Sequence, residues 1–317
     1  MSSGRTLLLF LDGVGVGPPD PAVNPFFRAR LPVLSPLLGG EAPSLPPPAV
    51  RSDPRSVPEA PPPTPHASTP TRIFLLDPLL GVEGLPQSGT GQIALLTGRN
   101  APEIHGRHFG PWPPVGLRPL LEQENLLKKV VDEGGRALFA NAYPRGYPEG
   151  LSPRRVAAPP LAALSAGLLD RHHEALSRGE AVASEILNDG WQRHLGFTGL
   201  PSVTPEEAGR NLARLSREAD LTLYAHYQTD TAGHRGGMSG AVEALERVDA
   251  FLRGLLDHAP DDLLILIASD HGNIEDVRVG HTRNPVLGLA TGDGIDRLPA
   301  MDRLTDVAPA ILERVLA

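Results

Sequence analysis

The chain has 317 residues, 40% of them hydrophobic, and carries a formal net charge of −8 at pH 7. A chain of this length can bury a large core, and an acidic balance without a basic cluster argues against a nucleic-acid partner. The absence of cysteine excludes disulfides and thiolate metal sites, so any bound metal must use oxygen and imidazole ligands. No apolar run approaches the roughly 18 residues of a membrane span, and we expect a cytoplasmic protein with no membrane partner.

Five segments have the apolar texture of strands that are buried on both faces of a parallel sheet. The first, RTLLLFLD (5–12), ends in an acidic residue and lacks a cleavage site, so we interpret it as a core strand and not as a signal peptide. The other four are RALFANAY (136–143), LTLYAHYQ (221–228), DLLILIASD (262–270) and PVLGLATG (285–292).

Helical patterns lie between these strands. LLEQENLLKKVVDEGG (120–135) ends in a glycine cap, and TPEEAGRNLARLSREAD (204–220) opens with a capping box formed by Thr204 and Glu207. Two further amphipathic patterns are GAVEALERVDAFLRGLLDHA (240–259) and LTDVAPAILERVLA (304–317). Strands that alternate with helices of this length predict an α/β fold, with a mostly parallel sheet sandwiched by helices.

Two stretches interrupt the alternation. Residues 42–71 contain eleven prolines and few large apolar residues, which predicts an extended loop. A ligand for a proline-binding module is a weaker interpretation of the same stretch. Residues 144–203 are mainly helical in pattern, so we expect a small cap insert on a catalytic core made of residues 1–143 and 204–317.

Aspartate and histidine residues gather where the predicted strands end. A lone histidine is more often a structural or surface residue than a ligand, but three separate strand ends that present such residues make coincidence a poor explanation. Carboxylate oxygens and imidazole nitrogens suit a divalent cation, and open α/β sheets place their sites at the carboxyl ends of strands. The candidate ligands are Asp12, Asp230, His234, Asp270, His271 and His281.

The segment LPQSGTGQIALLTGRNAP (85–102) contributes two hydroxyls, Ser88 and Thr90, in a glycine-rich turn before a predicted helix. Taken alone, this pattern is most often an ordinary helix cap. A helix amino terminus also suits an anion and can activate a hydroxyl nucleophile, especially beside metal ions.

Several motifs together resemble the alkaline phosphatase superfamily, in particular the branch of cofactor-independent phosphoglycerate mutase and phosphopentomutase. They occur in the family's order: LFLDGVGVG, QSGTGQIALLTGR, DTAGHRG, SDHGNIED with GHTRNPV, and LTDVAPAILE. The resemblance implies a dinuclear centre of Mn²⁺ or Zn²⁺, with Mg²⁺ as an alternative. One ion would be held by Asp230, His234 and His281, and the second by Asp12, Asp270 and His271.

The same resemblance implies that Ser88 is the nucleophile, that it also contacts the second ion, and that it is transiently phosphorylated. Thr90 is the alternative nucleophile. Gln92 stands where the mutase motif has histidine. The glycines Gly13, Gly15 and Gly17 after Asp12 are interpreted as letting the backbone turn away tightly beside the metal centre.

The substrate contacts are not aligned to any family position, because the cap insert is much smaller than that of the large mutases. Each basic residue taken singly is more often a solvated surface charge. The candidate substrate-binding residues are His105, Arg107, His108, Arg145, Arg154 and Arg171, with Arg155, His172, His173, Arg178 and Arg193 as further basic residues of the insert.

These observations predict a two-metal phosphoryl-transfer enzyme that acts on a small phosphorylated metabolite, as a phosphomutase or a phosphohydrolase, and the resemblance to the mutase branch favours a mutase-like enzyme. The alternatives are a phosphodiesterase, nucleotide pyrophosphatase or sulfatase-type hydrolase, and a metal-binding scaffold without activity. A nicotinamide-dependent oxidoreductase built on the opening glycines is disfavoured, because PPDP (18–21) cannot continue that loop into a helix. The sequence sets no oligomeric state.

Overall fold

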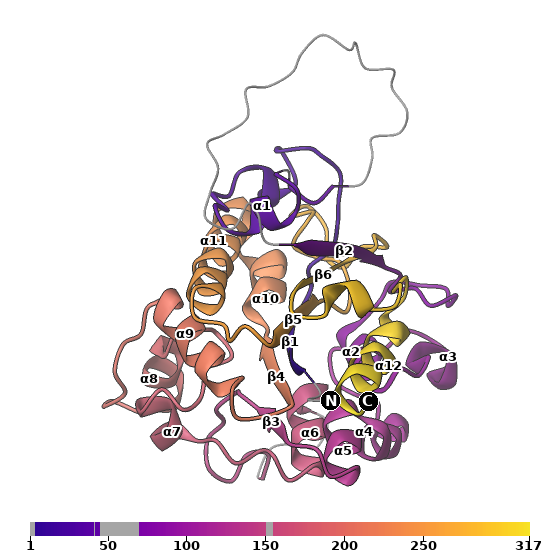
Figure 1. Cartoon of the computed structure of the whole chain (residues 1–317). Coiled ribbons are helices and arrows are strands. Elements are labelled where there is room, and N and C mark those ends of the chain that lie inside the picture. Colours follow the sequence, from indigo (N-terminus) through magenta and orange to yellow (C-terminus); the bar gives the residue numbers. More distant parts are fainter. Residues whose placement is uncertain (1–3, 41, 45–69, 150–154) are drawn as a thin grey trace.

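A six-stranded sheet forms the centre of the molecule, with the strand order β2-β6-β5-β1-β4-β3 (Figure 1). The computed structural model describes residues 4–40, 42–44, 70–149 and 155–317, so most of the predicted proline-rich loop at 42–71 lies outside the described residues. The strands are β1 (Arg5–Leu11), β2 (Thr71–Leu76), β3 (Ala137–Phe139), β4 (Leu221–His226), β5 (Leu263–Ala268) and β6 (Val286–Gly292). The predicted α/β class with a mostly parallel sheet is confirmed.

β1 is the central strand of the parallel part of the sheet. It pairs in parallel with β4 on one side and with β5 on the other, and β3 continues the parallel ladder beyond β4. Leu7, Leu8, Leu9 and Phe10 are fully buried, as expected for a strand covered on both faces. The carboxyl ends of β1, β4 and β5 therefore meet at one edge of the sheet.

The other side of the sheet is antiparallel. β6 pairs antiparallel with β5, and β2 pairs antiparallel with β6 as the edge strand. β2 was not predicted, because the proline-rich pattern was extended to residue 71. Its alternation of exposed Ile73 and Leu75 with buried Phe74 and Leu76 is the period-two signal of a half-buried strand.

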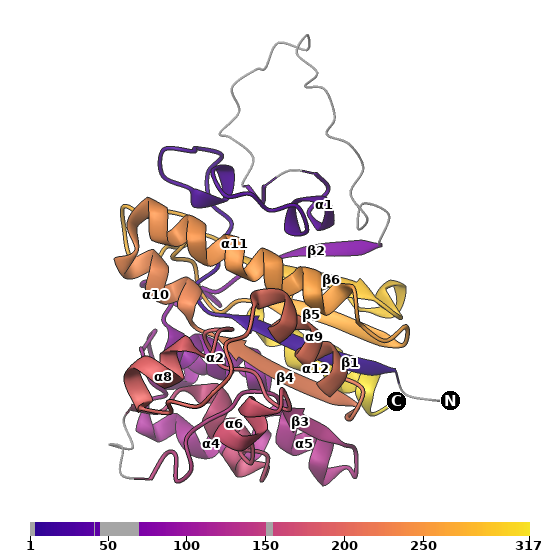
Figure 2. The ribbon, with the colours of Figure 1, turned by 90° about the vertical axis from the view of Figure 1, so that its left-hand side faces the viewer.

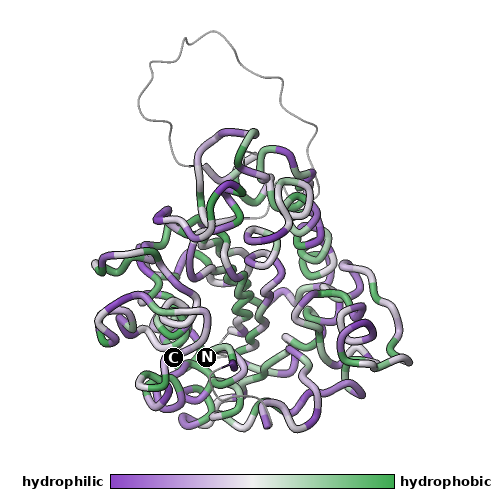
Figure 3. The backbone as a smooth tube through the Cα atoms, turned by 180° about the vertical axis from the view of Figure 1, so that it is seen from behind, coloured by the Kyte–Doolittle hydropathy of each residue, from purple (hydrophilic) through white to green (hydrophobic). Residues whose placement is uncertain are grey.

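Helices cover both faces of the sheet, as Figures 1 and 2 show from two directions. One buried cluster joins α2, α4, α5, α6 and α12 to one face, and a second joins α1, α9, α10 and α11 to the other. In Figure 3 the most hydrophobic stretches of the chain gather in the middle, where the strands lie. The described helices are α1 (Leu34–Leu37), α2 (Ser88–Thr97), α3 (Ala101–His105), α4 (Arg118–Glu124), α5 (Leu126–Asp132), α6 (Ala158–Ser165), α7 (His173–Ser177), α8 (Asp189–Leu195), α9 (Pro205–Leu215), α10 (Gln228–Arg235), α11 (Gly237–Leu256) and α12 (Leu304–Val315).

Local capping accounts for two helix boundaries. The capping box predicted at the start of α9 is confirmed, since Thr204 Oγ1 accepts from the Glu207 N–H at 3.1 Å and the Glu207 carboxylate accepts from the Thr204 N–H at 2.7 Å. The single helix predicted over 120–135 was wrong. Asn125 has extended backbone angles and its side chain caps α5 through the Lys128 N–H at 3.0 Å, so the segment forms α4 and α5 instead.

The predicted cap insert at 144–203 contributes to two different clusters. α6 packs on α2, α4 and α5 within the main core. The remainder, with α7 and α8, surrounds a small separate cluster that contains Trp191. The division into core and cap stays a prediction.

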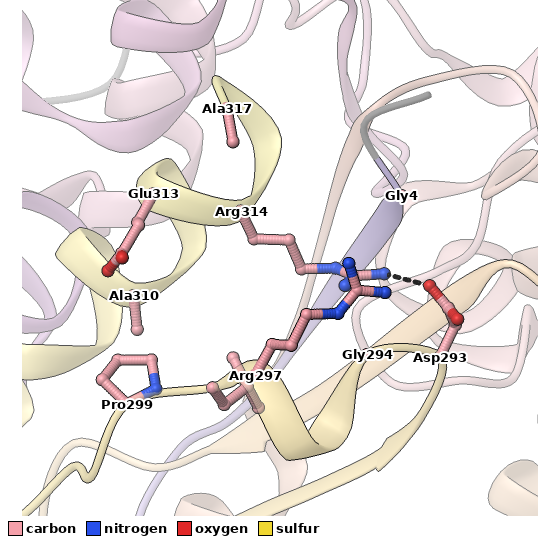
Figure 4. A pocket seen from close by; sticks show the side chains of 10 residues that line it. Gly4, Asp293, Gly294, Arg297, Pro299, Ala310, Glu313, Arg314 and Ala317 are labelled. Atoms are coloured by element: carbon pink, nitrogen blue, oxygen red, sulfur yellow. Dashed lines mark hydrogen bonds and ion pairs between the residues drawn. The ribbon is translucent and has the colours of Figure 1, made fainter. Parts of the chain in front are cut away.

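The two edges of the parallel sheet differ in chemistry. At the amino-terminal edge of β1, a cavity of about 320 Å³ is lined by Asp293, Arg297, Glu313 and Arg314 (Figure 4). Arg314 pairs with Asp293 at 2.8 Å, and a Cβ added at Gly294 would collide with its guanidinium. None of the predicted metal ligands lines this cavity; they lie at the carboxyl-terminal edge. Among the described residues, no helix is long and apolar enough to cross a membrane.

We predict that the close crossing of α9 and α11 depends on Gly254. A Cβ at Gly254 would collide with the carbonyl oxygen of Glu206 in α9, so Gly254→Ala should lower the free energy of unfolding by about 1 to 3 kcal/mol. Gly240→Ala in the same helix is the control, because no other atom lies within 4 Å of its added Cβ. Urea denaturation should show unchanged or higher stability for that control; equal stability of Gly254→Ala and the wild type would contradict the predicted crossing.

Candidate metal centre

All six predicted metal ligands lie together at the carboxyl-terminal edge of the sheet. Asp12 directly follows β1, whereas Asp270 and His271 follow β5. The ligand atoms of Asp12, Asp270 and His271 lie within 4.8 Å of one another, and the same is true of Asp230, His271 and His281. Because these strands are parallel neighbours, the fold brings together residues that are more than 200 positions apart.

The first group consists of Asp230, His234 and His281. Asp230 and His234 lie one turn apart on α10, with Asp230 Oδ1 3.4 Å from His234 Nε2. His281 Nε2 lies 3.1 Å from His234 Nε2 and 3.9 Å from Asp230 Oδ1. His281 Nδ1 lies 2.7 Å from the Pro86 carbonyl oxygen, which assigns the proton to Nδ1 and leaves Nε2 as an electron-pair donor.

The second group consists of Asp12, Asp270 and His271. His271 Nε2 lies 3.2 Å from Asp12 Oδ1 and 3.8 Å from Asp270 Oδ2. The other oxygen of Asp270 accepts a hydrogen bond from the Gly13 N–H at 3.2 Å. His271 also lies between the two groups, since its ring stacks on His281 at 3.9 Å and its Nε2 is 3.9 Å from Asp230 Oδ1.

The electrostatics of the second group fit a bound cation. Asp12 and Asp270 are buried, and Asp12 Oδ1 and Asp270 Oδ2 accept no hydrogen bond from any described residue. Burial raises the pKa of both carboxyls, and the charge of Asp270 adds to the rise at Asp12. Two buried carboxylates beside a single histidine leave an excess of negative charge, which is costly to bury. A hard or borderline divalent cation bound by these oxygen and imidazole donors would neutralise them.

The pKa values of His271 and His281 are shifted in opposite directions. Burial disfavours the charged form of His271, but Asp270, Asp12 and Asp230 outweigh it and raise the His271 pKa to about 10. Burial, with the charge of His271, lowers the pKa of His281 to about 4. The two histidines and the carboxylates of Asp12, Asp230 and Asp270 thus lie close together at one edge of the sheet. Strongly shifted pKa values of this kind are common at functional sites.

Ser88 and Thr90 lie at the start of α2 but face different surroundings. Ser88 Oγ is 2.9 Å from His271 Nε2, beside the second group. Thr90 is fully buried, and its hydroxyl accepts from the Phe109 N–H at 3.1 Å. The Thr90 N–H donates to the Phe109 carbonyl at 2.9 Å, while no described residue accepts from the N–H of Ser88 or Gly89. The first two N–H groups of α2 therefore have no acceptor among the described residues, as is common at the start of a helix.

Gln92, which stands where the mutase motif has histidine, contacts the predicted metal ligand Asp12. Its side-chain N–H donates to Asp12 Oδ2 at 3.0 Å, and its carbonyl oxygen accepts from the Ala158 N–H at 3.4 Å. Gln92 is therefore a neutral hydrogen-bond partner of Asp12 that also contacts the first residue of α6.

The structure requires glycine after Asp12 for two different reasons. Gly13 has a left-handed φ of +71°, and an added Cβ would lie 2.8 Å from Asp230 Oδ1, which agrees with a tight turn beside the metal ligands. Gly15 and Gly17 have no such backbone angle; instead, an added Cβ at either position would collide with Glu275. Glu275 is not among the predicted site residues, although its place in SDHGNIED, five residues after the predicted ligand Asp270, was a signal in the sequence.

The predicted substrate-binding residues stay predictions. Arg154 lies outside the described residues, and the other five have local partners. His105 and Arg107 contact the ring of Phe109, and His108 Nε2 lies 3.2 Å from the Val82 carbonyl. Arg145 forms an ion pair with Glu174 at 2.8 Å, and Arg171 forms one with Asp170 at 2.9 Å.

Comparisons with known proteins agree with this geometry. Residues 201–317 match the family described as the Metalloenzyme superfamily. Related sequences include the 2,3-bisphosphoglycerate-independent phosphoglycerate mutases of Mycoplasmopsis pulmonis, 28% identical over 131 residues, and of Staphylococcus aureus, 33% identical over 104 residues. These matches cover 38% and 30% of this chain, but only 25% and 20% of the two mutases.

Solved structures extend the likeness to the whole chain. The protein PH0037 of Pyrococcus horikoshii is 14% identical with a TM-score of 0.58, over 99% of this chain and 97% of that one. The alkaline phosphatase of the Antarctic bacterium TAB5 is 12% identical with a TM-score of 0.51, over 98% of this chain and 98% of that one. This chain has the alkaline phosphatase fold. The fold implied by the resemblance is thereby confirmed, and the match of residues 201–317 to the Metalloenzyme superfamily agrees with a site for divalent metal ions.

His226 is a buried core residue of this alkaline phosphatase fold. Its ring Nδ1 lies 2.8 Å from the Ser184 carbonyl oxygen, and its own carbonyl accepts from the Asp12 N–H at 2.9 Å. Burial lowers the pKa of His226 from 6.5 to about 4. The unfolded chain therefore binds a proton between pH 6.5 and 4 that the folded chain does not.

We predict a loss of stability in acid that His226 causes. Because the folded-state pKa is depressed, the contribution of His226 to the free energy of unfolding should fall by about 3 kcal/mol as the pH decreases from 6.5 to 4. His226→Gln, which does not titrate, should show a correspondingly shallower pH dependence. Urea denaturation of both proteins in a chelating buffer at pH 7 and pH 4.5 measures the difference; parallel profiles would refute it.

Proposed function

We propose that this protein is a metal-dependent phosphohydrolase that cleaves small phosphate monoesters through Ser88. The observation that carries the proposal is the position of the Ser88 hydroxyl, 2.9 Å from His271 Nε2 and beside the carboxylates of Asp12 and Asp270. A hydroxyl at a helix start, next to two groups of metal-ligating side chains, is the arrangement expected for a nucleophile in phosphoryl transfer.

The proposed ligand sets are those implied by the family resemblance. Asp230, His234 and His281 would hold one ion, and Asp12, Asp270 and His271, with Ser88, would hold the second. The donors are oxygen and imidazole only, which suits Mn²⁺ or Zn²⁺. Two bound divalent ions would neutralise the phosphoryl oxygens and lower the pKa of the nucleophilic hydroxyl.

The chain's own residues supply attack and positioning. Ser88 Oγ attacks phosphorus in line; the new oxygen–phosphorus bond forms as the bond to the alcohol leaving group breaks, and the serine proton passes to solvent. The free N–H groups of Ser88 and Gly89 at the start of α2 stabilise the developing negative charge on the phosphoryl oxygens. Water then hydrolyses the phosphoserine, which releases inorganic phosphate and restores Ser88.

We favour hydrolysis over a mutase reaction because two described arginines of the insert already have acidic partners. A mutase must hold the dephosphorylated intermediate until the phosphoryl group returns to a different hydroxyl. Arg145 and Arg171 are engaged in ion pairs with Glu174 and Asp170. The mutase relatives support the alternative of a phosphomutase, and the chain aligns with a quarter or less of their length.

We predict that Ser88→Ala abolishes turnover and leaves metal binding largely intact. Loss of the nucleophile should reduce kcat for an aryl phosphate by at least about 10³-fold, since the remaining groups cannot form the covalent intermediate. Thr90→Val is the matched control; it should keep kcat within about tenfold, because its hydroxyl binds the Phe109 backbone. Retained activity in Ser88→Ala, or its loss only in Thr90→Val, would assign the nucleophile elsewhere.

The choice between hydrolysis and isomerisation has a direct test. The Mn²⁺-loaded protein is incubated with a panel of sugar phosphates and phosphoglycerates, and ³¹P NMR follows the products. We expect stoichiometric inorganic phosphate. An isomeric phosphate ester without free phosphate would establish the mutase alternative.

A further inference from the structure

Glu275 is a buried carboxylate that belongs to neither metal-ligand group. It lies between His271 and His281 in the chain and is fully inaccessible to solvent. Its Oε2 accepts from the Gly15 N–H at 3.1 Å and the Asn273 N–H at 2.7 Å, and its Oε1 accepts from the Asn284 amide at 3.1 Å and the Thr282 hydroxyl. Among the described residues it has no cationic partner, so four neutral donors satisfy it.

Each of these donors belongs to a loop that carries a predicted metal ligand. Gly15 follows Asp12 by three residues, and Thr282 directly follows His281. Asn273 follows His271 by two residues, and its side-chain amide donates to Asp230 Oδ1 at 2.6 Å. One carboxylate therefore connects the loops that present ligands of the first group with those that present ligands of the second.

The surrounding glycines show that the space is shaped around this side chain. A Cβ added at Gly15 or Gly272 would collide with the Glu275 carboxyl group, and a Cβ at Gly17 would lie 2.7 Å from its Cγ. Backbone from two loops thus packs directly on the Glu275 side chain. A displacement of the carboxylate must displace both loops, because close packing leaves them no room to adjust separately.

We propose that Glu275 is a positioning residue that sets the separation of the two metal-ligand groups and thereby strengthens the binding of both cations. This inference rests on the proposed metal-dependent function. Glu275 acts through Gly15, Asn273 and Thr282 and contacts no ligand atom itself. Hydrogen-bond partners that orient metal ligands typically contribute about 10- to 100-fold in metal affinity, which sets the expected size of the effect.

The first test replaces Glu275 with glutamine and titrates the metal-free full chain with Mn²⁺ in a calorimeter. Glutamine keeps the shape but turns an NH₂ group toward N–H and O–H donors, so both association constants should fall about 10- to 100-fold. Asp276→Asn is the matched control, because this neighbouring carboxylate pairs with Arg278 at 2.6 Å instead. The control should retain wild-type affinities within about threefold.

Thermal unfolding in chelator separates positioning from a purely structural role. If Glu275 only stabilises the fold, Glu275→Gln will lower the unfolding temperature of the metal-free chain and bind both Mn²⁺ ions with wild-type affinity. That result would overturn the proposal.

A second pair of variants keeps the test decisive if Glu275→Gln does not fold. Thr282→Val removes the hydroxyl that donates to Glu275, whereas Thr282→Ser retains it. We expect one of the two Mn²⁺ affinities to fall about tenfold in the valine variant and to recover in the serine variant. Equal affinities in both variants would overturn the proposal.

The outcome is distinguishable from failure of the proposed function. A wild-type chain that binds two Mn²⁺ ions but releases no phosphate from any ester refutes the phosphohydrolase proposal, while the titrations still decide the role of Glu275. A wild-type chain that binds fewer than two Mn²⁺ ions overturns the positioning proposal itself.

Discussion

The main constraint on this structure is the electrostatic repulsion between three aspartates that lie together at one largely buried edge of the sheet. Asp12, Asp230 and Asp270 approach one another through the parallel pairing of β1 with β4 and β5. Their mutual repulsion is opposed by the imidazole of His271, by backbone N–H groups such as that of Gly13, and by the amides of Gln92 and Asn273. The positive charge of His271 and the dipoles of these donors hold the carboxylates in place, and a bound divalent cation would complete the balance.

The sequence predicted those parts of the molecule whose determinants are local or periodic. The apolar runs of β1, β4 and β5 marked buried strands, and their carboxyl ends placed the aspartates and histidines correctly at one edge. The start of α9 followed from its capping box. Alignment with the family motif predicted that Ser88 lies beside the metal ligands. The 2.9 Å distance between Ser88 Oγ and His271 Nε2 agrees with that alignment.

The features that the sequence did not reveal depend on tertiary partners. Asn125 divided a predicted helix, because its side chain caps α5 and also donates to the Leu121 carbonyl at 2.7 Å. β2 has a period-two pattern of its own, but its place at the edge of the sheet is set by its antiparallel pairing with β6. Gly15 and Gly17 resembled a turn in sequence, but their lack of a side chain makes room for Glu275, 260 and 258 residues away along the chain. Such long-range complementarity has no period and no fixed spacing.

The central position of β1 has a consequence for the order in which the protein is built. β1 is the first strand in the chain, yet Thr6 pairs with Leu221 and Arg5 pairs with Leu263. Contacts this distant in sequence are slow to form, because the intervening chain must lose its freedom first. Asp12 can approach Asp270 only once β1 has paired with β5. We therefore expect metal binding at the second group to follow assembly of the sheet, in contrast to small domains that fold around a local metal site.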